Sequence, residues 1–505
     1  MAEPLLTALI KFRAEEQPDT VFAKFRDGHV TWGAFWDRIR RFARGIRAAG
    51  VKPGERVALL LPNCPEFLDV FYGVISAGAS PVPLNTGQQG ETLAYMLRDC
   101  GARAIVADAS LQQRYDPGGL IEVVRGAPAR GSAIELGTLM AAPAELPELD
   151  EAPAEGFGIM YTSGTTGPPK GVVQRRTDVS PLLAMWQAMD VKAGETMYTC
   201  LPLFHGNPIG LSVTGAMFLD AKVAIGERFS ASRFWDEVRG FGAVEFNHVG
   251  ALIPILLKQP ERADDRDNPV RVCLSAGCPP QSWEPFERRF GIRIVEQFSM
   301  VDSPGYLLNV DGPAGSMGKP TPGSEAAVLD DDGNEVPPNV AGELCLRATE
   351  GRTHDYLNMP DATDEAYRGG WFHTGDLARR DQDGWFYYVG RKRESMRRRG
   401  ENVSAWEIEN VVNQFPQVLE SAAHAVPSLR RTSPRAIEWL RSAFSGGSWT
   451  SGSSTGTPVA LKSTSTSRSS RGRPMHVVAS MSRASAAPRL MATTRPRSSR
   501  SSAVS

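Results

Sequence analysis

The sequence predicts a large α/β fold with two parallel-rich sheets, a small β subdomain and a truncated α+β C-terminal domain. Three observations predict this class. Helical and strand patterns alternate between residues 31 and 296, two Asp-Gly turns separate strand-like runs between 326 and 390, and the composition changes abruptly near residue 429. Repeated alternation is typical of parallel sheets covered by helices, because a parallel strand is reached through a crossover connection.

The first elements follow one another with clear start and stop signals. Thr31 can cap a helix that Gly50 ends, and its apolar residues are Trp32, Phe35, Trp36, Ile39, Phe42 and Ile46. A strand over 56–61, a helix over 66–77 and a strand over 81–84 come next. Further helix and strand pairs are predicted at 91–99 with 103–107, 230–239 with 243–246, 251–258 with 270–275 and 281–290 with 292–296.

The β-rich part is predicted over residues 326–348 and 377–390. Asp332-Gly333-Asn334 and Asp383-Gly384 each lie between strand-like runs and favour hairpins. A helix over 403–415 and a strand near 417–427 follow. These elements predict a domain over 1–389 and the start of a second, incomplete domain over 390–428.

Composition places the chain among globular proteins. Its 505 residues are 41% hydrophobic and 22% charged, and no apolar run is long enough to span a bilayer. The N-terminus lacks the basic and apolar regions of a signal peptide, so we expect a cytoplasmic protein. The six cysteines show no C-x-x-C spacing, which favours neither a disulfide framework nor a zinc site.

A loop rich in glycine and hydroxyl groups follows a predicted buried strand at 156–160. Its residues are Thr162, Ser163, Gly164, Thr165, Thr166, Gly167 and, after two prolines, Lys170. Backbone N–H groups, hydroxyls and a lysine together suit a polyphosphate. The loop is not a P-loop, since Pro169 and not glycine precedes Lys170. A flexible linker is the alternative, but it explains neither the strand nor the lysine.

Residues 161–173 closely resemble the phosphate-binding signature of the adenylate-forming superfamily of acyl-CoA synthetases, luciferases and peptide-synthetase adenylation domains. Segments 201–206, 275–279, 297–302, 371–376 and 390–409 resemble further motifs of that family in the same order. The resemblance covers about residues 4–428. It implies an enzyme that uses ATP and Mg²⁺ to activate a small carboxylic acid and then transfers the acyl group to CoA.

The resemblance assigns candidate roles around the phosphates and the acyl group. Lys170 and Thr165 would act on the phosphates, and His205 would border the acyl pocket. For His205, a hydrogen-bonded core histidine is the alternative. Trp186, Asn247 and His248 are weaker candidates for the acyl pocket, and the last two could equally be core polar groups.

The adenine and the metal are assigned to two later motifs. The turn of Gly277, Cys278 and Pro279 would lie against adenine, although it could be an ordinary turn between a strand and a helix. The family's aromatic-Gly-x-Thr-Glu motif corresponds to Phe298, Ser299, Met300, Val301 and Asp302. Phe298 would stack on adenine and Asp302 would hold Mg²⁺, but valine cannot donate to phosphate and the shorter aspartate favours a bridging water.

Ribose and a hinge complete the resemblance. Asp376 would accept hydrogen bonds from the ribose hydroxyls, Arg391 would contact ribose or phosphate, and Glu394 takes the hinge position. Asp376 could instead cap a hairpin, and the basic run 391–399 could be a solvated face.

The C-terminal part lacks a feature that the resemblance implies. Family members complete adenylation with a lysine near the chain end, whereas Lys462 is the one lysine after Lys392 and matches no family motif. The resemblance therefore implies impaired adenylation. The alternatives are a catalytically inactive protein that binds ATP or acyl-adenylate, and an adenylation domain serving a carrier module that the sequence does not contain.

Residues 429–505 differ from everything before them. They carry 13 basic residues against one acidic residue, Glu438, and are dominated by Ser, Arg, Thr, Ala and Pro. Such a composition predicts disorder. A basic arm for RNA and an out-of-frame translation are the two explanations, and the second is favoured because the resemblance stops inside an element. We expect no nucleic acid partner and leave a homodimer open.

Overall fold

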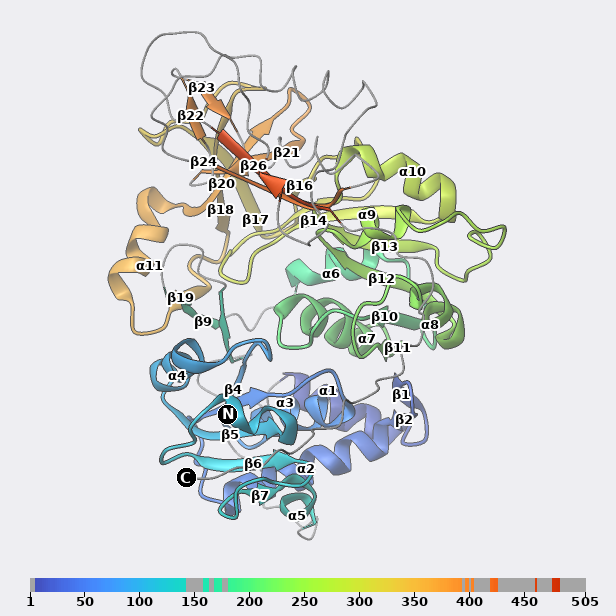
Figure 1. Cartoon of the computed structure of the whole chain (residues 1–505), viewed down its shortest axis with the longest axis vertical. Coiled ribbons are helices and arrows are strands. Elements are labelled where there is room, and N and C mark those ends of the chain that lie inside the picture. The colour runs from blue at the N-terminus through green and yellow to red at the C-terminus, as the bar shows by residue number, and fades with distance from the viewer. Residues whose placement is uncertain are drawn as a thin grey trace, which may run out of the picture. The chain divides into compact units, whose positions relative to one another are not determined.

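The computed structural model describes residues 5–141, 158–162, 168–174, 180–392, 396–398, 401–403, 418–425, 459–460 and 475–481 (Figure 1). The chain forms two compact units, with the boundary between Arg393 and Glu394. The boundary predicted from the sequence, 389/390, lies four residues before this position. Most of the predicted helix over 403–415 lies outside the described residues.

A five-stranded parallel sheet has the strand order β4-β3-β5-β6-β7. Its strands are β3 (Arg56–Leu60), β4 (Ser80–Pro83), β5 (Ala102–Asp108), β6 (Ile121–Arg125) and β7 (Ile134–Glu135). Its helices are α2 (Trp32–Ala48), α3 (Pro65–Ser76), α4 (Gly90–Asp99) and α5 (Leu136–Met140). The predicted cap of α2 is confirmed, because Oγ1 of Thr31 accepts a hydrogen bond from the Ala34 N–H at 3.3 Å.

A nine-stranded sheet has the order β16-β15-β14-β13-β12-β10-β11-β1-β2, and its central strands are parallel. The strands are β1 (Val21–Phe25), β2 (Gly28–Thr31), β10 (Thr196–Thr199), β11 (Lys222–Ile225), β12 (Ala243–Val249), β13 (Val272–Ala276), β14 (Arg293–Phe298), β15 (Leu307–Asn309) and β16 (Lys319–Pro320). The predicted pairs of helices and strands are confirmed. The edges are antiparallel, so the sheet is mixed.

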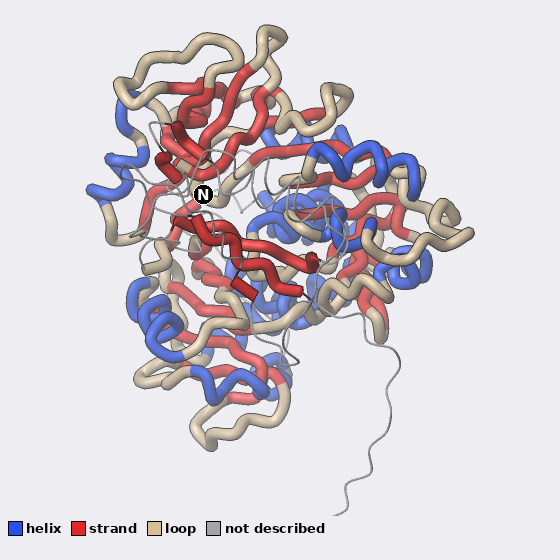
Figure 2. Tube along the Cα trace, turned by 45° about the horizontal axis from the view of Figure 1, so that its top comes forward, coloured by secondary structure: helices blue, strands red, loops and turns tan. Residues whose placement is uncertain are grey.

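Three apolar layers hold the two sheets, whose strands appear in red in Figure 2. The largest core joins one face of each sheet through α1 (Leu5–Glu16), α2, α3, α6 (Ser180–Ala188), η2 (Pro208–Val213) and α7 (Thr214–Phe218). The outer face of the nine-stranded sheet packs against α8 (Phe234–Phe241), α9 (Leu252–Leu257) and α10 (Pro280–Phe290). The other face of the five-stranded sheet packs against α4. Burial on both faces explains why the parallel strands are continuous apolar runs.

Two smaller sheets complete the first unit. β17 (Ser324–Leu329), β18 (Ala341–Ala348), β20 (Phe372–Arg380) and β21 (Phe386–Arg391) form an antiparallel sheet in that order, and the predicted Asp-Gly turns lie at its strand ends. β8 (Ile159–Tyr161), β9 (Gly171–Gln174) and β19 (His354–Tyr356) form the other sheet, with β9 in the middle.

The second unit has two described sheets. β22 (Met396–Arg398) pairs with β23 (Glu401–Val403), and β26 (Met475–Met481) lies between β24 (Val418–Ala425) and β25 (Val459–Ala460). β25 and β26 fall within 429–505, so the expected disorder does not hold for these residues. Met475–Met481 includes two adjacent valines, a residue type that favours strands. For the rest of 429–505 disorder stays a prediction.

Candidate active site

The phosphate loop is held at its two ends by a hairpin. The Thr162 N–H donates to the Lys170 carbonyl at 2.9 Å, and the Lys170 N–H lies 3.4 Å from Oγ1 of Thr162. β8 and β9 continue this pairing away from the loop. Five predicted loop residues, Ser163, Gly164, Thr165, Thr166 and Gly167, lie outside the described residues. Thr162 and Lys170 are therefore the loop positions that the structure places.

Tyr356 joins Lys170 to the predicted metal ligand. Nζ of Lys170 lies 4.2 Å from the centre of the Tyr356 ring, and the Tyr356 hydroxyl donates to Oδ2 of Asp302 at 2.7 Å. β19 pairs antiparallel with β9, which puts Tyr356 opposite Val172. Tyr356 could not be predicted from the sequence, because nothing in a short strand signals which distant strand it will pair with.

Asp302 has the properties that a magnesium ligand needs. Its side chain is buried, and within the described part of the chain its Oδ1 has no hydrogen-bond partner. Burial raises the pKa of Asp302, against the Tyr356 hydrogen bond and the positive charges of Lys170 and Arg391. An unpartnered carboxylate oxygen fits a hard cation, which would supply charge neutralisation for phosphate oxygens.

Asp376, the predicted ribose ligand, is connected to Asp302 and Lys170 by Arg391. Asp376 on β20 lies opposite Arg391 on β21, and Nε of Arg391 is 3.2 Å from Oδ1 of Asp376. The charge of Arg391 also acts on Asp302. Lys170, Asp302, Arg391 and Asp376 therefore form one charged cluster. Glu394, the predicted hinge, lies outside the described residues.

Glu343 anchors the turn that carries Asp376. Its Oε1 accepts the Gly375 N–H at 3.2 Å, and its Oε2 lies 2.9 Å from Nζ of Lys392 and 3.1 Å from Nδ1 of His373. Although burial opposes it, these hydrogen bonds lower the pKa of Glu343. Donor atoms of Glu343, Cys345 and His373 lie within 4.8 Å of one another, a spacing that a metal could bridge. Lys392 and Arg368 already pair with this carboxylate, so we assign it to anchoring.

The predicted adenine turn is held from behind by a buried carboxylate. Gly277 has φ +86°, and Oε1 of Glu296 accepts the N–H groups of Gly277 and Cys278. Burial raises the pKa of Glu296 to about 7, against these hydrogen bonds and one from Ser275. An acidic residue directly after Ile294 and Val295, at the end of the predicted strand 292–296, was the sequence signal for Glu296.

The other two adenine candidates have ordinary structural surroundings. Pro279 precedes α10, and Phe298 is half-buried and packs against the apolar core of the small antiparallel sheet. Their assignment to adenine stays a prediction.

A cavity of about 570 Å³ contains the predicted acyl-pocket segment. His205 and Ser299 line it, together with η2, which is a short π-helix. Desolvation by its surroundings lowers the pKa of His205, so this side chain is neutral near pH 7. Single-turn π-helices occur frequently at functional sites because they redirect side chains.

Two of the weaker acyl-pocket candidates are structural. Nδ1 and Nε2 of His248 lie 2.9 Å from the Ser275 hydroxyl and the Gly250 carbonyl, and burial lowers the pKa of His248 to about 4. Trp186 is buried and stacks on Phe218 with 5.0 Å between ring centres. Asn247 is also buried, but its amide donates to Asn207, which lines the cavity.

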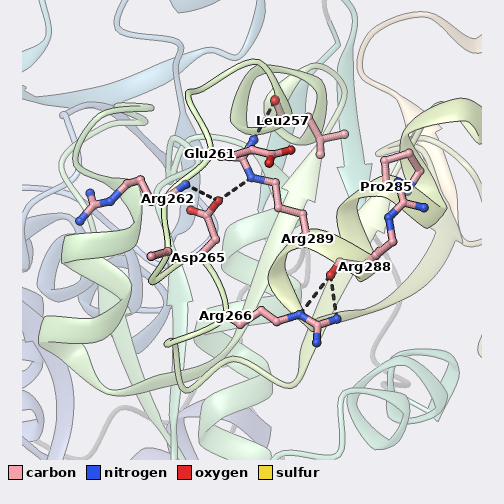
Figure 3. A pocket seen from close by; sticks show the side chains of 9 residues that line it. Leu257, Glu261, Arg262, Asp265, Arg266, Pro285, Arg288 and Arg289 are labelled. Atoms are coloured by element: carbon pink, nitrogen blue, oxygen red, sulfur yellow. Dashed lines mark hydrogen bonds and ion pairs between the residues drawn. The ribbon is translucent and has the colours of Figure 1, made fainter.

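A second cavity, of about 550 Å³, lies between α9 and α10 (Figure 3). Its arginines are committed to internal partners. Arg289 pairs with Asp265 at 2.7 Å and donates to three backbone carbonyls, while Arg266 donates twice to the Arg288 carbonyl. These residues do not belong to the charged cluster. Their hydrogen bonds connect α9, α10 and the loop between α9 and β13.

Comparisons with known proteins identify a family. The sequence profile of the AMP-binding enzyme family matches residues 10–356. The chain is 33% identical to a sulfoacetate–CoA ligase of Cupriavidus necator, covering 84% of this chain and 85% of that protein. It is 30% identical to a crotonobetaine/carnitine–CoA ligase of Salmonella arizonae, covering 77% and 79%.

Solved structures show the same fold. An anthranilate CoA ligase in complex with anthranoyl-AMP has a TM-score of 0.75 at 22% identity and covers 86% of this chain and 89% of that chain. An O-succinylbenzoate coenzyme A synthetase of Bacillus subtilis, solved with ATP and a magnesium ion, has a TM-score of 0.71 at 24% identity, covering 83% and 87%.

Within the described part of the chain, no helix combines the length and the apolar character needed to cross a bilayer. Profile, relatives and fold agree on one family assignment. The chain belongs to the AMP-binding enzyme family of acid–thiol ligases, which use ATP, Mg²⁺ and CoA.

Proposed function

We propose that this chain is an acyl-CoA synthetase that converts a small carboxylic acid and ATP to acyl-AMP and pyrophosphate, and then forms the CoA thioester. The observation that carries this proposal is the cluster of Lys170, Asp302, Arg391 and Asp376. Attack of a carboxylate on a phosphate brings two anions together, so catalysis depends on charge neutralisation and alignment.

Each member of the cluster has a separate task. Lys170 neutralises phosphate oxygens, with the loop hydroxyls including Thr165 as further donors. Asp302 holds Mg²⁺, while Asp376 orients the ribose and Arg391 contacts ribose or phosphate. His205, which is neutral, borders the acid in the cavity. Gly277, Cys278 and Pro279 with Phe298 bind adenine, and Glu394 is the pivot before CoA enters.

We further propose that the adenylation step is slow. No lysine in the sequence after Lys392 matches the one that family members use, and Lys462 stands in an unrelated context. Loss of one charge-stabilising donor typically lowers kcat by about 10²-fold or more. Among the acids, the crotonobetaine/carnitine–CoA ligases and a medium/long-chain-fatty-acid–CoA ligase of Mycobacterium marinum suggest the first panel to test.

The test is ATP–pyrophosphate exchange with that panel, next to thioester formation from chemically supplied acyl-AMP. We expect weak exchange, which a Lys170→Ala variant abolishes. Ordinary exchange rates would contradict the proposed impairment. Binding of ATP or acyl-AMP with neither exchange nor thioester formation would instead establish the second candidate, an inactive adenylate-binding protein, which the absent lysine also favours.

A further inference from the structure

The cavity next to the charged cluster lacks the side chains that are always charged at neutral pH. Among the described residues, no aspartate, glutamate, lysine or arginine lines it, although the cluster lies nearby. Two histidines line it: the pKa of His205 is lowered, so that side chain adds no charge at neutral pH, and Nδ1 of His354 lies 2.7 Å from the Thr353 hydroxyl. An acyl group with a second charge would find no carboxylate, lysine or arginine in the described walls, and burying an unpaired charge is costly.

The cavity is nevertheless not purely apolar. Gln297 lies on β14 and is only 2% exposed, yet it lines the cavity, and its Oε1 has no hydrogen-bond partner among the described residues. A buried amide oxygen without a partner costs free energy unless something outside the chain satisfies it. The position of Gln297 therefore points to a ligand group that donates a hydrogen bond.

A second amide lines the same cavity. Asn207 accepts a hydrogen bond from Nδ2 of buried Asn247, which occupies the Asn207 oxygen and leaves the Asn207 Nδ2 as the donor that this side chain can offer to the cavity. A cavity lined by an amide donor and an amide acceptor suits a ligand hydroxyl, which can both donate and accept.

The rest of the described lining is mostly apolar but includes further polar side chains. Phe71, Leu182 and Leu211 are among the apolar residues, whereas Gln174, Ser299, Tyr306 and His354 also line the cavity, and the Thr214 hydroxyl lies 3.4 Å from the Tyr72 hydroxyl. Among these described lining residues, Gln297 is the one that has a buried side-chain oxygen without a hydrogen-bond partner. An unsatisfied acceptor in this lining favours a hydroxylated chain over a plain alkyl chain and over a dicarboxylate.

We propose that the cavity selects an uncharged carboxylic acid that carries a hydroxyl group, and that Gln297 is its specificity-determining residue. This inference rests on the proposed function, because it assumes that the cavity holds the acyl part of the adenylate. It concerns binding alone and involves no step of the reaction.

The test uses binding and not turnover, so that slow adenylation does not obscure it. The probes are 5′-sulfamoyladenosine analogues acylated with hexanoyl, 3-hydroxyhexanoyl, 6-hydroxyhexanoyl and the charged adipoyl group, titrated calorimetrically into the full chain, with AMP as a probe of the nucleotide site. We expect at least one hydroxylated analogue to bind about 10-fold more tightly than hexanoyl, and adipoyl to bind most weakly.

Two variants locate the effect. Gln297→Met, which removes the amide and keeps the length, should abolish the hydroxyl preference by tightening hexanoyl binding. Gln281→Met makes the same change on the exposed surface of α10 and should keep the preference. Thermal melting of both variants checks that they fold.

The outcomes separate this inference from the proposed function. Equal binding of hexanoyl and hydroxyhexanoyl by the unmodified chain, or tightest binding of adipoyl, overturns the inference while adenylate binding stands. A hydroxyl preference that survives Gln297→Met removes Gln297 from the proposal. If neither AMP nor any analogue binds, the proposed function fails and the inference fails with it.

Discussion

Two cavities of the first unit have similar volumes, but they differ in whether the buried polar groups near them have hydrogen-bond partners. Around the cavity between α9 and α10, Arg289, Asp265 and Arg266 are all committed to neighbours. At the active site, Asp302 and Gln297 are buried with an oxygen that no described residue satisfies. Volume therefore does not distinguish the two cavities, whereas unmet hydrogen-bonding capacity is found beside the cavity that the proposed function uses.

The largest expected effect tests the structural role of the arginine-lined cavity. Arg289→Met leaves buried Asp265 without its ion-pair partner and removes the Arg289 hydrogen bonds to three carbonyls, so we expect a loss of about 3–5 kcal/mol in the free energy of unfolding. Urea denaturation measures this loss, with Arg288→Met on the exposed side of α10 as the control. Weakened AMP binding without destabilisation would break the comparison.

The next prediction concerns Glu296 behind the adenine turn. Its pKa is raised to about 7, so the folded state binds its proton more tightly than the unfolded state does. Protonated Glu296 therefore makes its full contribution to the free energy of unfolding below about pH 4.5. This contribution, on the order of 3 kcal/mol, is lost as the pH rises through about 7.

Glu296→Gln can still accept the two N–H groups but does not titrate. We expect urea unfolding at pH 5 and pH 8 to show a smaller decrease in stability for the variant than for the unmodified chain. Identical decreases would mean that Glu296 does not take up a proton between pH 8 and pH 5. The hydrogen bonds from Gly277 and Cys278 would then be enough to keep this buried carboxylate charged.

A smaller effect is expected at the ribose motif. Asp376→Asn keeps the shape but removes the charge, and hydrogen bonds to charged groups contribute about 1.5–3 kcal/mol. We expect about a 10- to 100-fold loss of AMP affinity by calorimetry with little change in melting temperature. Asp381→Asn, in the adjacent hairpin turn, is the matched control, and an equal loss there would exclude a specific ribose contact.

The smallest effect is expected at the rim of the arginine-lined cavity. Arg262 pairs with Asp264 at 2.9 Å, but both side chains are exposed, and exposed pairs contribute little. Arg262→Gln should leave both the melting temperature and AMP affinity unchanged. A large loss of stability would show that this ion pair acts together with the buried one.

The sequence predicted the sheets and the order of the motifs because local signals carry both. The Thr31 cap, the continuous apolar strands and the Asp-Gly turns each depend on a few neighbouring residues. Contacts between distant segments could not be predicted in this way. Tyr356 lies against Lys170 because β19 pairs with β9, and His248 bonds to Ser275 because that residue lies on the adjacent strand.

Residues 429–505 show what composition alone misses. Their Ser- and Arg-rich sequence predicts disorder throughout, yet Met475–Met481 pairs with β24 over most of its length. A short segment with β-branched residues can pair with an existing strand even when the sequence on either side of the segment is too polar to form a core. Average composition conceals such segments.

The pairing of β19 with β9 sets a constraint on chain length. Tyr356 lies opposite Val172, and the next N–H, from Leu357, donates to the Gly171 carbonyl at 2.7 Å. Side chains alternate between the faces of a strand, so inserting or deleting one residue in this short segment would turn the tyrosine ring away from Lys170. Natural variants of this protein should therefore accept substitutions in residues 354–356 far more readily than single-residue insertions or deletions.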